Sequence, residues 1–176
     1  MSPLYLILAL VAAERLVELA VAGRNTRRLL AEGGIEHGRG HYPLFVLLHA
    51  GWLGTLLLAV PPERAVDWPL IGVYGLLIAA RIWTMASLGR RWTTRIVTLP
   101  GAPLVRRGPY RYVRHPNYLI VVAEIAVLPL AFGAWRTAIL FSLVNLALLA
   151  YRIRVEDAAL AAGAPKVDRA HGRALE

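Results

Sequence analysis

The fold is decided by residues 117–153, which read NYLIVVAEIAVLPLAFGAWRTAILFSLVNLALLAYRI. Two apolar blocks, residues 117–134 and 137–153, approach the roughly 20 residues that a helix needs to cross the ~30 Å hydrocarbon core of a bilayer. Their junction, Gly133-Ala134-Trp135-Arg136, is long enough for a tight turn between antiparallel helices. The stretch therefore predicts a helical hairpin in a membrane, with Pro129 kinking or ending its first helix.

Three further apolar blocks precede the hairpin, at residues 3–22, 43–60 and 69–88. The chain is 57% apolar and 18% charged, whereas soluble domains carry about 25% charged residues. We therefore predict an all-α integral membrane protein with about five transmembrane helices. A single transmembrane domain covers residues 1–163 in this prediction, and a polar tail covers residues 164–176.

The basic residues alternate between the connecting segments. Of the 20 Lys and Arg residues, 16 fall in residues 23–42, residues 89–116 and the segment from Arg152 onward, which share one side of a five-span topology. Only Arg64 and Arg136 fall on the other side. By the positive-inside rule, the N-terminus lies outside and the C-terminus is cytoplasmic.

The net charge of +9 belongs mainly to these flanking segments. Such a distribution favours contact with anionic membrane lipids and gives no indication of nucleic-acid binding. The chain has no cysteine, which excludes disulfides, thiol nucleophiles and Cys-ligated metals. Nothing in the sequence indicates an oligomeric state.

A polar, basic and aromatic segment, GPYRYVRHPNY at residues 108–118, stands between the third and fourth apolar blocks. Arg and His resist entering hydrocarbon, so their concentration at the edge of a bilayer is unfavourable unless it has a use. A cation, an imidazole and several phenols within eleven residues are more typical of a binding site than of a connection.

A second polar cluster begins within the fifth block and continues past its end. At 100° per residue, Asn145, Arg152 and Glu156 fall within about 40° of one another on one helix face. The simpler interpretation is an exit helix with a solvated Arg–Glu pair. The alternative is a joint site, because the hairpin can bring this face against residues 108–118.

Two other groups of residues have structural interpretations. The glycine-rich segment 33–40 follows a helical block and no strand, so it predicts a turn and not a dinucleotide-binding loop. His37 and His41 lack a third ligand, so no metal site is predicted. Trp83 and Trp92 are expected in an interfacial belt, or alternatively along an acyl-chain groove.

Glu14, Glu18, Arg81 and Glu124 are charged residues at or within the predicted spans. Charges in lipid are unfavourable, so these side chains should face the interior of the bundle. We favour a structural ion pair of Arg81 with Glu124 or Glu18 over a catalytic role.

Taken together, the motifs resemble those of the isoprenylcysteine carboxyl methyltransferase family. The resemblance covers roughly residues 75–160 and is carried by the following residues in order: Gly108-Pro109-Tyr110-Arg111, Arg114-His115-Pro116-Asn117-Tyr118, the apolar hairpin, Arg152-Ile153 and Glu156-Asp157. These are integral-membrane enzymes that use S-adenosylmethionine, and phospholipid N-methyltransferases share a looser version of the pattern. The acidic pair here is Glu-Asp where Glu-Glu is common, and the family's aromatic, Pro-containing tail is not recognisable after residue 163.

The first half adds a narrower likeness to the small bacterial branch of that family, some of whose members methylate alkylpyrones or alkylresorcinols. This likeness rests on Glu14-Arg15-Leu16-Val17-Glu18-Leu19, Arg24-Asn25, Gly33-Gly34 and His41-Tyr42-Pro43. It implies location in a bacterial inner membrane.

The resemblance also implies a cytoplasmic cofactor site. Its cofactor-binding residues would be Arg114, His115, Pro116, Tyr118, Arg152 and Glu156, of which His115 and Arg152 would also be catalytic. His115 and Tyr118 would line the pocket, while Arg114 and Pro116 would shape the turn. Glu156 would bind the ribose or amino group of S-adenosylmethionine, and Arg152 would hold either its carboxylate or an anionic oxygen of the substrate.

The implied reaction is methyl transfer from S-adenosylmethionine to an oxygen (carboxylate, enol or phenol) of a lipid-like amphipathic acceptor. One alternative is a phospholipid N-methyltransferase. Another is a non-catalytic membrane protein that binds lipid or a partner through its basic segments. Cofactor binding separates this last class from both enzymes.

Overall fold

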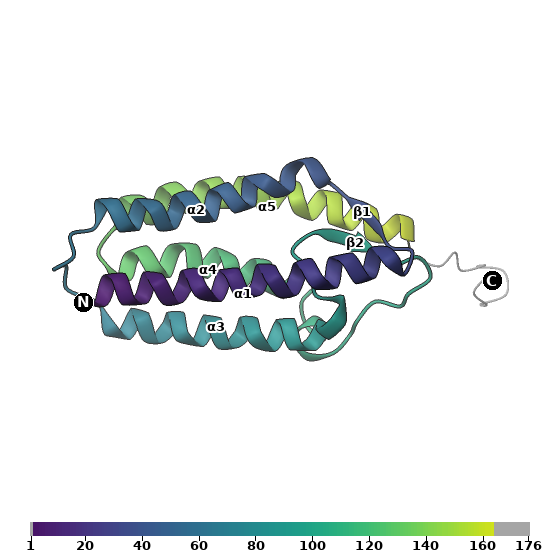
Figure 1. The fold of residues 1–176 in the computed structure, drawn as a ribbon, viewed down its shortest axis with the longest axis horizontal. Helices are drawn as coiled ribbons and strands as arrows, with labels where there is room; N and C mark the ends of the chain where they lie inside the picture. The colour runs from purple at the N-terminus through teal and green to yellow at the C-terminus, as the bar shows by residue number, and fades with distance from the viewer. Residues whose placement is uncertain (1, 164–176) are drawn as a thin grey trace.

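In the computed structural model, which describes residues 2–163, the α-helices run side by side along the length of the molecule (Figure 1). They are α1 (Pro3–Ala31), α2 (Tyr42–Ala59), α3 (Trp68–Leu88), α4 (Pro116–Ala131) and α5 (Trp135–Gly163). The helical segments Arg39–Ala59, Trp68–Arg91 and Trp135–Ala162 are long and apolar enough to cross a membrane, whereas α4 is shorter. The predicted helical bundle is therefore confirmed, and the predicted tail falls outside the described residues.

The hairpin at the end of the chain forms as the sequence predicts. Helix α4 ends two residues after Pro129, and the Pro129 carbonyl accepts hydrogen bonds from the backbone N–H groups of Phe132 at 3.1 Å and Ala134 at 2.9 Å. Gly133 adopts φ +67°, a left-handed conformation that glycine reaches without steric penalty. Pro129 thus marks the end of α4, and α5 returns antiparallel beside it.

Helix α1 is longer than predicted, because part of the segment 23–42 that we expected to be a loop is helical. The extension is held by its polar side chains. The Asn25 amide donates to the Trp92 carbonyl at 2.9 Å, and the hydroxyls of Thr26 and Thr93 lie 2.6 Å apart. These contacts tie the last turns of α1 to the segment that follows α3.

Two short strands, β1 (Ile35–His37) and β2 (Ile96–Thr98), pair antiparallel with Ile35 opposite Thr98. They lie at the end of the bundle where α1 and α5 finish (Figure 1). The all-α prediction did not include them. Their β-branched residues suit a pleated ribbon, but three residues are too few to show a strand periodicity in the sequence.

The ribbon is fastened by Glu36. Its carboxylate accepts hydrogen bonds from Arg95 at 2.8 Å and from Arg39 at 3.1 Å. Burial opposes ionisation, but the hydrogen bonds from the two guanidinium groups outweigh it and lower the pKa of Glu36.

Single-turn 3-10 helices complete this end of the molecule: η1 (Arg39–His41), η2 (Gly89–Arg91) and η3 (Gly108–Arg111). Gly108 has φ +55°, and a Cβ there would lie 2.0 Å from Ser87 Oγ. Glycine at this position lets η3 pack tightly against α3, which fixes where the segment 108–118 enters the bundle.

The interior changes from apolar to polar along the bundle. Its apolar half lies around the first turns of α1, and its fully buried residues include Leu4, Trp52, Leu56, Ile125, Leu128 and Phe132. The middle of the bundle and the half nearer the strands bury charged and polar side chains, namely Glu18, Asn25, Arg81, Glu124, Asn145 and Arg152. The buried charged side chains that a functional site could use therefore lie away from the apolar end of the bundle.

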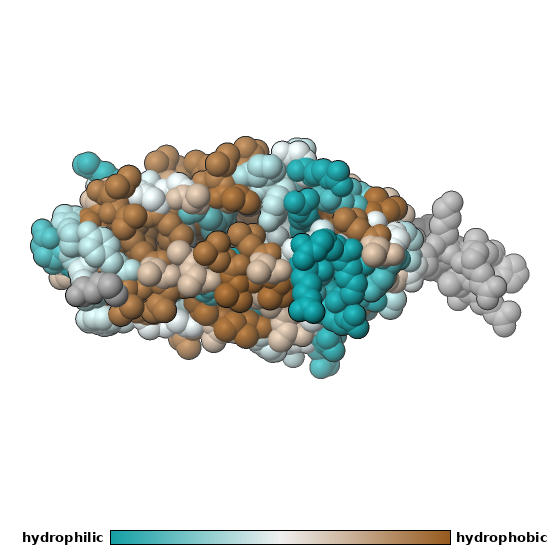
Figure 2. All heavy atoms as spheres, viewed as in Figure 1, coloured by the Kyte–Doolittle hydropathy of each residue, from teal (hydrophilic) through white to brown (hydrophobic). Residues whose placement is uncertain are grey.

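The flanks of the bundle are apolar on the face seen in Figure 2, and a hydrophilic band covers the end with the strands. Exposed large apolar side chains occur on every helix, and examples are Leu10, Leu16, Leu47, Leu58, Leu76, Ile82, Leu119, Leu140 and Leu143. A surface this apolar is typical of contact with lipid.

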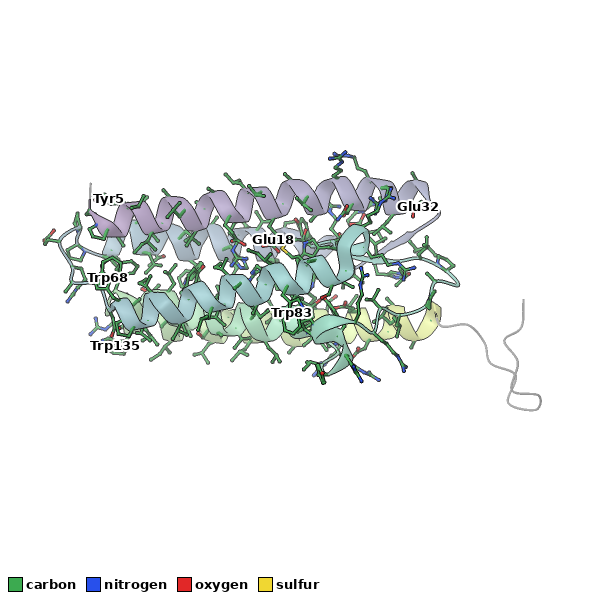
Figure 3. The ribbon with its side chains drawn as sticks, turned by 90° about the horizontal axis from the view of Figure 1, so that it is seen from below. Tyr5, Glu18, Glu32, Trp68, Trp83 and Trp135 are labelled. Atoms are coloured by element: carbon green, nitrogen blue, oxygen red, sulfur yellow. The ribbon has the colours of Figure 1, made fainter. Side chains whose placement is uncertain are left out.

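Aromatic residues mark the ends of the apolar flanks. Tyr5, Trp68 and Trp135 lie at the end opposite the strands (Figure 3). Trp83 is 56% exposed on the flank of α3, which suits an interfacial position. The interfacial-belt prediction for Trp92 was wrong, because this residue is only 3% exposed and packs inside the molecule, where Asn25 binds its carbonyl.

Topology can be tested with reporter fusions after residues 62, 100 and 170. We expect the fusion after residue 62 to report the outside, and those after residues 100 and 170 to report the cytoplasm, because 16 of the 20 basic residues fall on one side. Reports of one and the same side from residues 62 and 100 would contradict the five-span topology.

Candidate functional site

The two polar clusters singled out in the sequence meet in the structure, at the junction of α4 and α5. His115 stands just before α4, and its imidazole lies between two carboxylates of α5. Its Nε2 is 3.2 Å from Asp157 Oδ1, and its Nδ1 is 3.6 Å from Glu156 Oε2. The antiparallel hairpin accounts for this contact between residues about 40 positions apart.

Tyr118 connects the members of the cluster. Its ring stacks on that of His115, with centroids 5.2 Å apart and an interplanar angle of 14°. Its hydroxyl donates to the Glu156 carboxylate and accepts a 2.7 Å hydrogen bond from Arg152 Nε. One phenol thus joins α4 to both the cation and the anion of α5.

Arg152 is the most deeply placed charge of the cluster, with only 7% of the residue exposed. Its Nη2 donates to the Thr94 carbonyl at 2.7 Å. Its guanidinium carbon lies 5.2 Å from the ring centroid of Phe45 and 5.7 Å from that of Tyr118. Contact with two aromatic rings stabilises a cation that has lost most of its water.

Tyr110, in η3, borders the same site. Burial raises the pKa of its phenol, and the negative charge of Glu156 raises that pKa further. Tyr110 therefore stays protonated at neutral pH and presents a hydroxyl group and an aromatic face.

The remaining predicted residues differ in their positions. Pro116 is buried at the first turn of α4, where its fixed φ suits helix initiation. Arg114 is exposed, and among the described residues its side chain forms no hydrogen bond or ion pair. The structure thus brings together His115, Tyr118, Arg152 and Glu156, whereas the Arg114 side chain stays outside the cluster.

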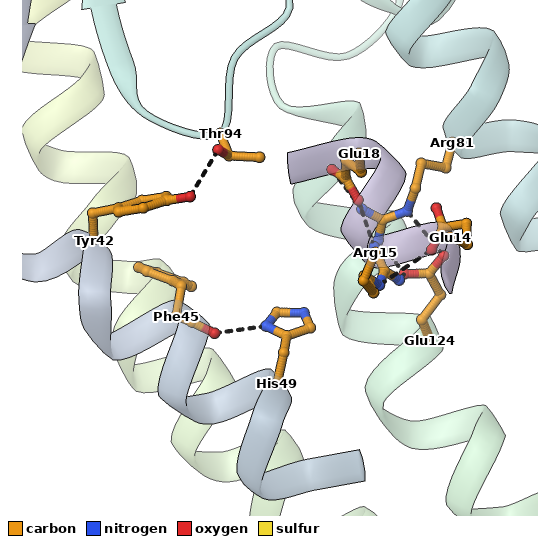
Figure 4. Close-up of polar contacts among 9 residues, drawn as sticks. All are labelled: Glu14, Arg15, Glu18, Tyr42, Phe45, His49, Arg81, Thr94 and Glu124. Carbon is orange, nitrogen blue, oxygen red and sulfur yellow. Dashed lines mark hydrogen bonds and ion pairs between the residues drawn. The ribbon is translucent and has the colours of Figure 1, made fainter. Parts of the chain in front are cut away.

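Two residues that contact Arg152 were not predicted from the sequence to belong to the site. Phe45 looked like any apolar residue of a span, and Thr94 contributes a backbone carbonyl, which leaves no trace in the sequence. The nearby His41-Tyr42-Pro43 motif could have indicated that this region borders the site. Its Tyr42 hydroxyl lies 3.1 Å from the hydroxyl of Thr94 (Figure 4). The His41 ring also packs edge-on to Tyr151, with centroids 5.2 Å apart.

A separate ionic cluster lies inside the bundle and joins α1, α3 and α4 (Figure 4). Arg81 donates to Glu18 at 3.0 Å and to Glu124 at 3.1 Å. Arg15 donates to the same carboxylates, at 2.9 Å and 2.6 Å. The expected pairing of Arg81 with Glu124 or Glu18 is confirmed with both partners, and Arg15 is a further member for which no pairing was predicted.

The groups at the α4–α5 junction suit S-adenosylmethionine, which carries a carboxylate, an ammonium, a sulfonium, a ribose and an adenine. Arg152 matches the carboxylate, since a guanidinium can bind it through two N–H groups. The Glu156 carboxylate, 27% exposed, and the Asp157 carboxylate, 43% exposed, match the ammonium or ribose hydroxyls. Tyr110 offers an aromatic face for the adenine or the sulfonium.

Comparison with known proteins gives a family match over the same region. The Isoprenylcysteine carboxyl methyltransferase (ICMT) family profile matches residues 70–162. The uncharacterized protein YpbQ of Bacillus subtilis (strain 168) is 37% identical over 161 residues, which cover 89% of this chain and 95% of that protein. An uncharacterized protein of Haemophilus influenzae is 28% identical over 163 residues, which cover 90% and 95%. No solved structure shows a significant match.

Proposed function

The chain belongs to the isoprenylcysteine carboxyl methyltransferase family, and from this premise we propose that it transfers a methyl group from S-adenosylmethionine to an oxygen of a lipid-like acceptor. Family membership and the apolar helices make it a membrane methyltransferase. The observation that carries the finer proposal is the meeting of His115, Tyr118, Arg152 and Glu156 at one junction, with charges and rings that match the cofactor.

When bound, S-adenosylmethionine supplies an electrophilic methyl group on a sulfonium. An acceptor oxygen forms the new C–O bond while the C–S bond breaks, and the electron pair of that bond stays on sulfur. The protein acts mainly by aligning the two reactants and excluding water. Glu156 and Asp157 orient the cofactor in this proposal, and Tyr118 fixes Glu156 through its hydroxyl.

The ionisation of the acceptor determines how much acid–base chemistry the site must supply. A carboxylate or an acidic enol is already an anion at neutral pH, so no strong base is required. A phenol would have to transfer its proton, and the His115 imidazole, next to Asp157 and Glu156, is the group placed to accept it.

The acceptor reaches the site from the bilayer. Arg152 lies on the membrane side of Glu156 along α5, so the acceptor head meets Arg152 before it meets the more exposed carboxylates. In this orientation the basic end of the bundle faces the cytoplasm and the headgroups of anionic lipids, in a bacterial inner membrane.

The acceptor can be identified by transfer of radiolabel from S-adenosylmethionine. An alkylpyrone, an alkylresorcinol, a farnesylated cysteine analogue and phosphatidylethanolamine would be compared at equal concentration in detergent. We expect labelling of the alkylpyrone or the alkylresorcinol, because the first half of the chain resembles the branch that methylates such molecules. Labelling of phosphatidylethanolamine alone would replace O-methylation by N-methylation, and labelling of the farnesylated analogue alone would reject this choice of acceptor.

A further inference from the structure

Asn145 is a buried polar side chain that the protein leaves without a partner. It lies in the membrane-embedded part of α5 and is 0% exposed. Neither its Nδ2 nor its Oδ1 has a hydrogen-bond partner among the described residues. An amide buried in this way is destabilising, so native proteins rarely keep one without a use.

The position of Asn145 relative to Arg152 suggests a use. Seven residues make two helical turns, so the two side chains share a face of α5 and stand about 10 Å apart along it. Arg152 belongs to the cofactor cluster, and Asn145 lies on its membrane side. A lipid-like acceptor keeps its tail in the bilayer, so its head must lie between the depth of Asn145 and the depth of Arg152 along α5.

We propose that Asn145 is a specificity residue that hydrogen-bonds a second oxygen on the acceptor head, beside the oxygen that is methylated. This inference rests on the proposed function. An amide both donates and accepts, so its best partner is a hydroxyl group, which does the same.

The substrate class that follows is a ring or chain with two neighbouring oxygen substituents, such as a dihydroxylated aromatic head. A protonated amine, which only donates, would leave the Asn145 Nδ2 unpaired. A site that hydrogen-bonds a substrate hydroxyl rejects the analogue that lacks it, because the buried polar groups of the protein are then left unsatisfied. Binding requires side chains to move, since Asn145 is fully enclosed.

The test compares two ligands of equal chain length, a radiolabelled 5-alkylresorcinol with two hydroxyls and a radiolabelled 3-alkylphenol with one. Equilibrium dissociation constants are measured in detergent without cofactor, so this binding can be read even if the protein has no methyltransferase activity. Wild type is expected to bind the alkylresorcinol roughly ten- to a hundred-fold more tightly, the range expected for a buried polar group left unpaired. Asn145→Leu should abolish this preference and bind both ligands with similar affinity.

Two controls separate recognition from folding. Asn145→Leu removes an unsatisfied polar group, so its melting temperature should equal or exceed that of wild type. Asn145→Asp keeps the shape of the side chain but loses the amide donor, and it should retain part of the preference. The assignment of Asn145 is overturned if Asn145→Leu still prefers the alkylresorcinol over the alkylphenol. It is also overturned if wild type shows no such preference. Absence of S-adenosylmethionine binding by wild type would instead contradict the proposed function and leave the ligand comparison intact.

Discussion

Replacing Arg152 with Gln is expected to lower kcat/KM for methyl transfer by roughly 30-fold or more. The guanidinium is 7% exposed and donates to the Tyr118 hydroxyl and the Thr94 carbonyl. Truncating one partner of a buried, charged hydrogen-bond network removes about 2–5 kcal/mol of binding, which corresponds to roughly 30-fold to several thousand-fold.

The same variant shows which ligand Arg152 holds. A rise in the KM of S-adenosylmethionine alone would place its carboxylate on Arg152, whereas a rise in the KM of the acceptor alone would place the acceptor oxygen there. Arg154→Gln is the matched control, because Arg154 lies on the same helix but is exposed. Equal kinetics in wild type and Arg152→Gln would remove Arg152 from the site.

Replacing Arg81 with Leu is expected to destabilise the folded protein by about 3–5 kcal/mol, the usual effect of leaving a buried charge without its partner. Arg81 is 1% exposed and joins Glu18 of α1 to Glu124 of α4. Without it, both carboxylates depend on Arg15 alone. Loss of helical circular dichroism in detergent with increasing denaturant gives the free energy of unfolding.

A double variant tests whether an unpaired buried charge causes the lower stability of Arg81→Leu. Arg81→Leu combined with Glu124→Leu removes one charge of each sign and leaves Arg15 paired with Glu18 at 2.9 Å. It should be more stable than the single variant, since replacing a complete buried pair by apolar residues is often close to neutral. Arg64→Leu, in the exposed segment between α2 and α3, should unfold like wild type. An unfolding free energy for Arg81→Leu within about 0.5 kcal/mol of wild type would contradict a structural role for the ionic cluster.

The helices could be predicted from the sequence because apolar block length and proline positions are local signals. Pro129 and Gly133 define the α4–α5 turn, and the blocks agree with the helix bounds to within a few residues, apart from the extensions of α1 and α5. The α1 extension depends on side-chain hydrogen bonds of Asn25 and Thr26 to residues far along the chain. Such tertiary contacts, like those of the short strands, leave no periodicity in the sequence.

The candidate site was partly predictable for a related reason. Two polar clusters that border one helical hairpin must come close, so the contact of His115 with the acidic pair followed from connectivity. The environment of Arg152 did not follow, because Phe45 and a backbone carbonyl of Thr94 come from other elements. Arg114 shows the converse, since a residue within the motif lies outside the cluster that its neighbours form.

The central claim, that the α4–α5 junction binds S-adenosylmethionine, is tested most directly by calorimetric titration of the purified protein in detergent. We expect wild type to bind the cofactor, and His115→Ala and Glu156→Ala each to bind it roughly ten- to a hundred-fold more weakly, the usual effect of losing a polar contact to a charged ligand. Unchanged affinity in both variants would move the site elsewhere in the protein. No heat of binding by wild type at about millimolar cofactor, an affinity at the weak end for enzymes, would contradict the methyltransferase account itself.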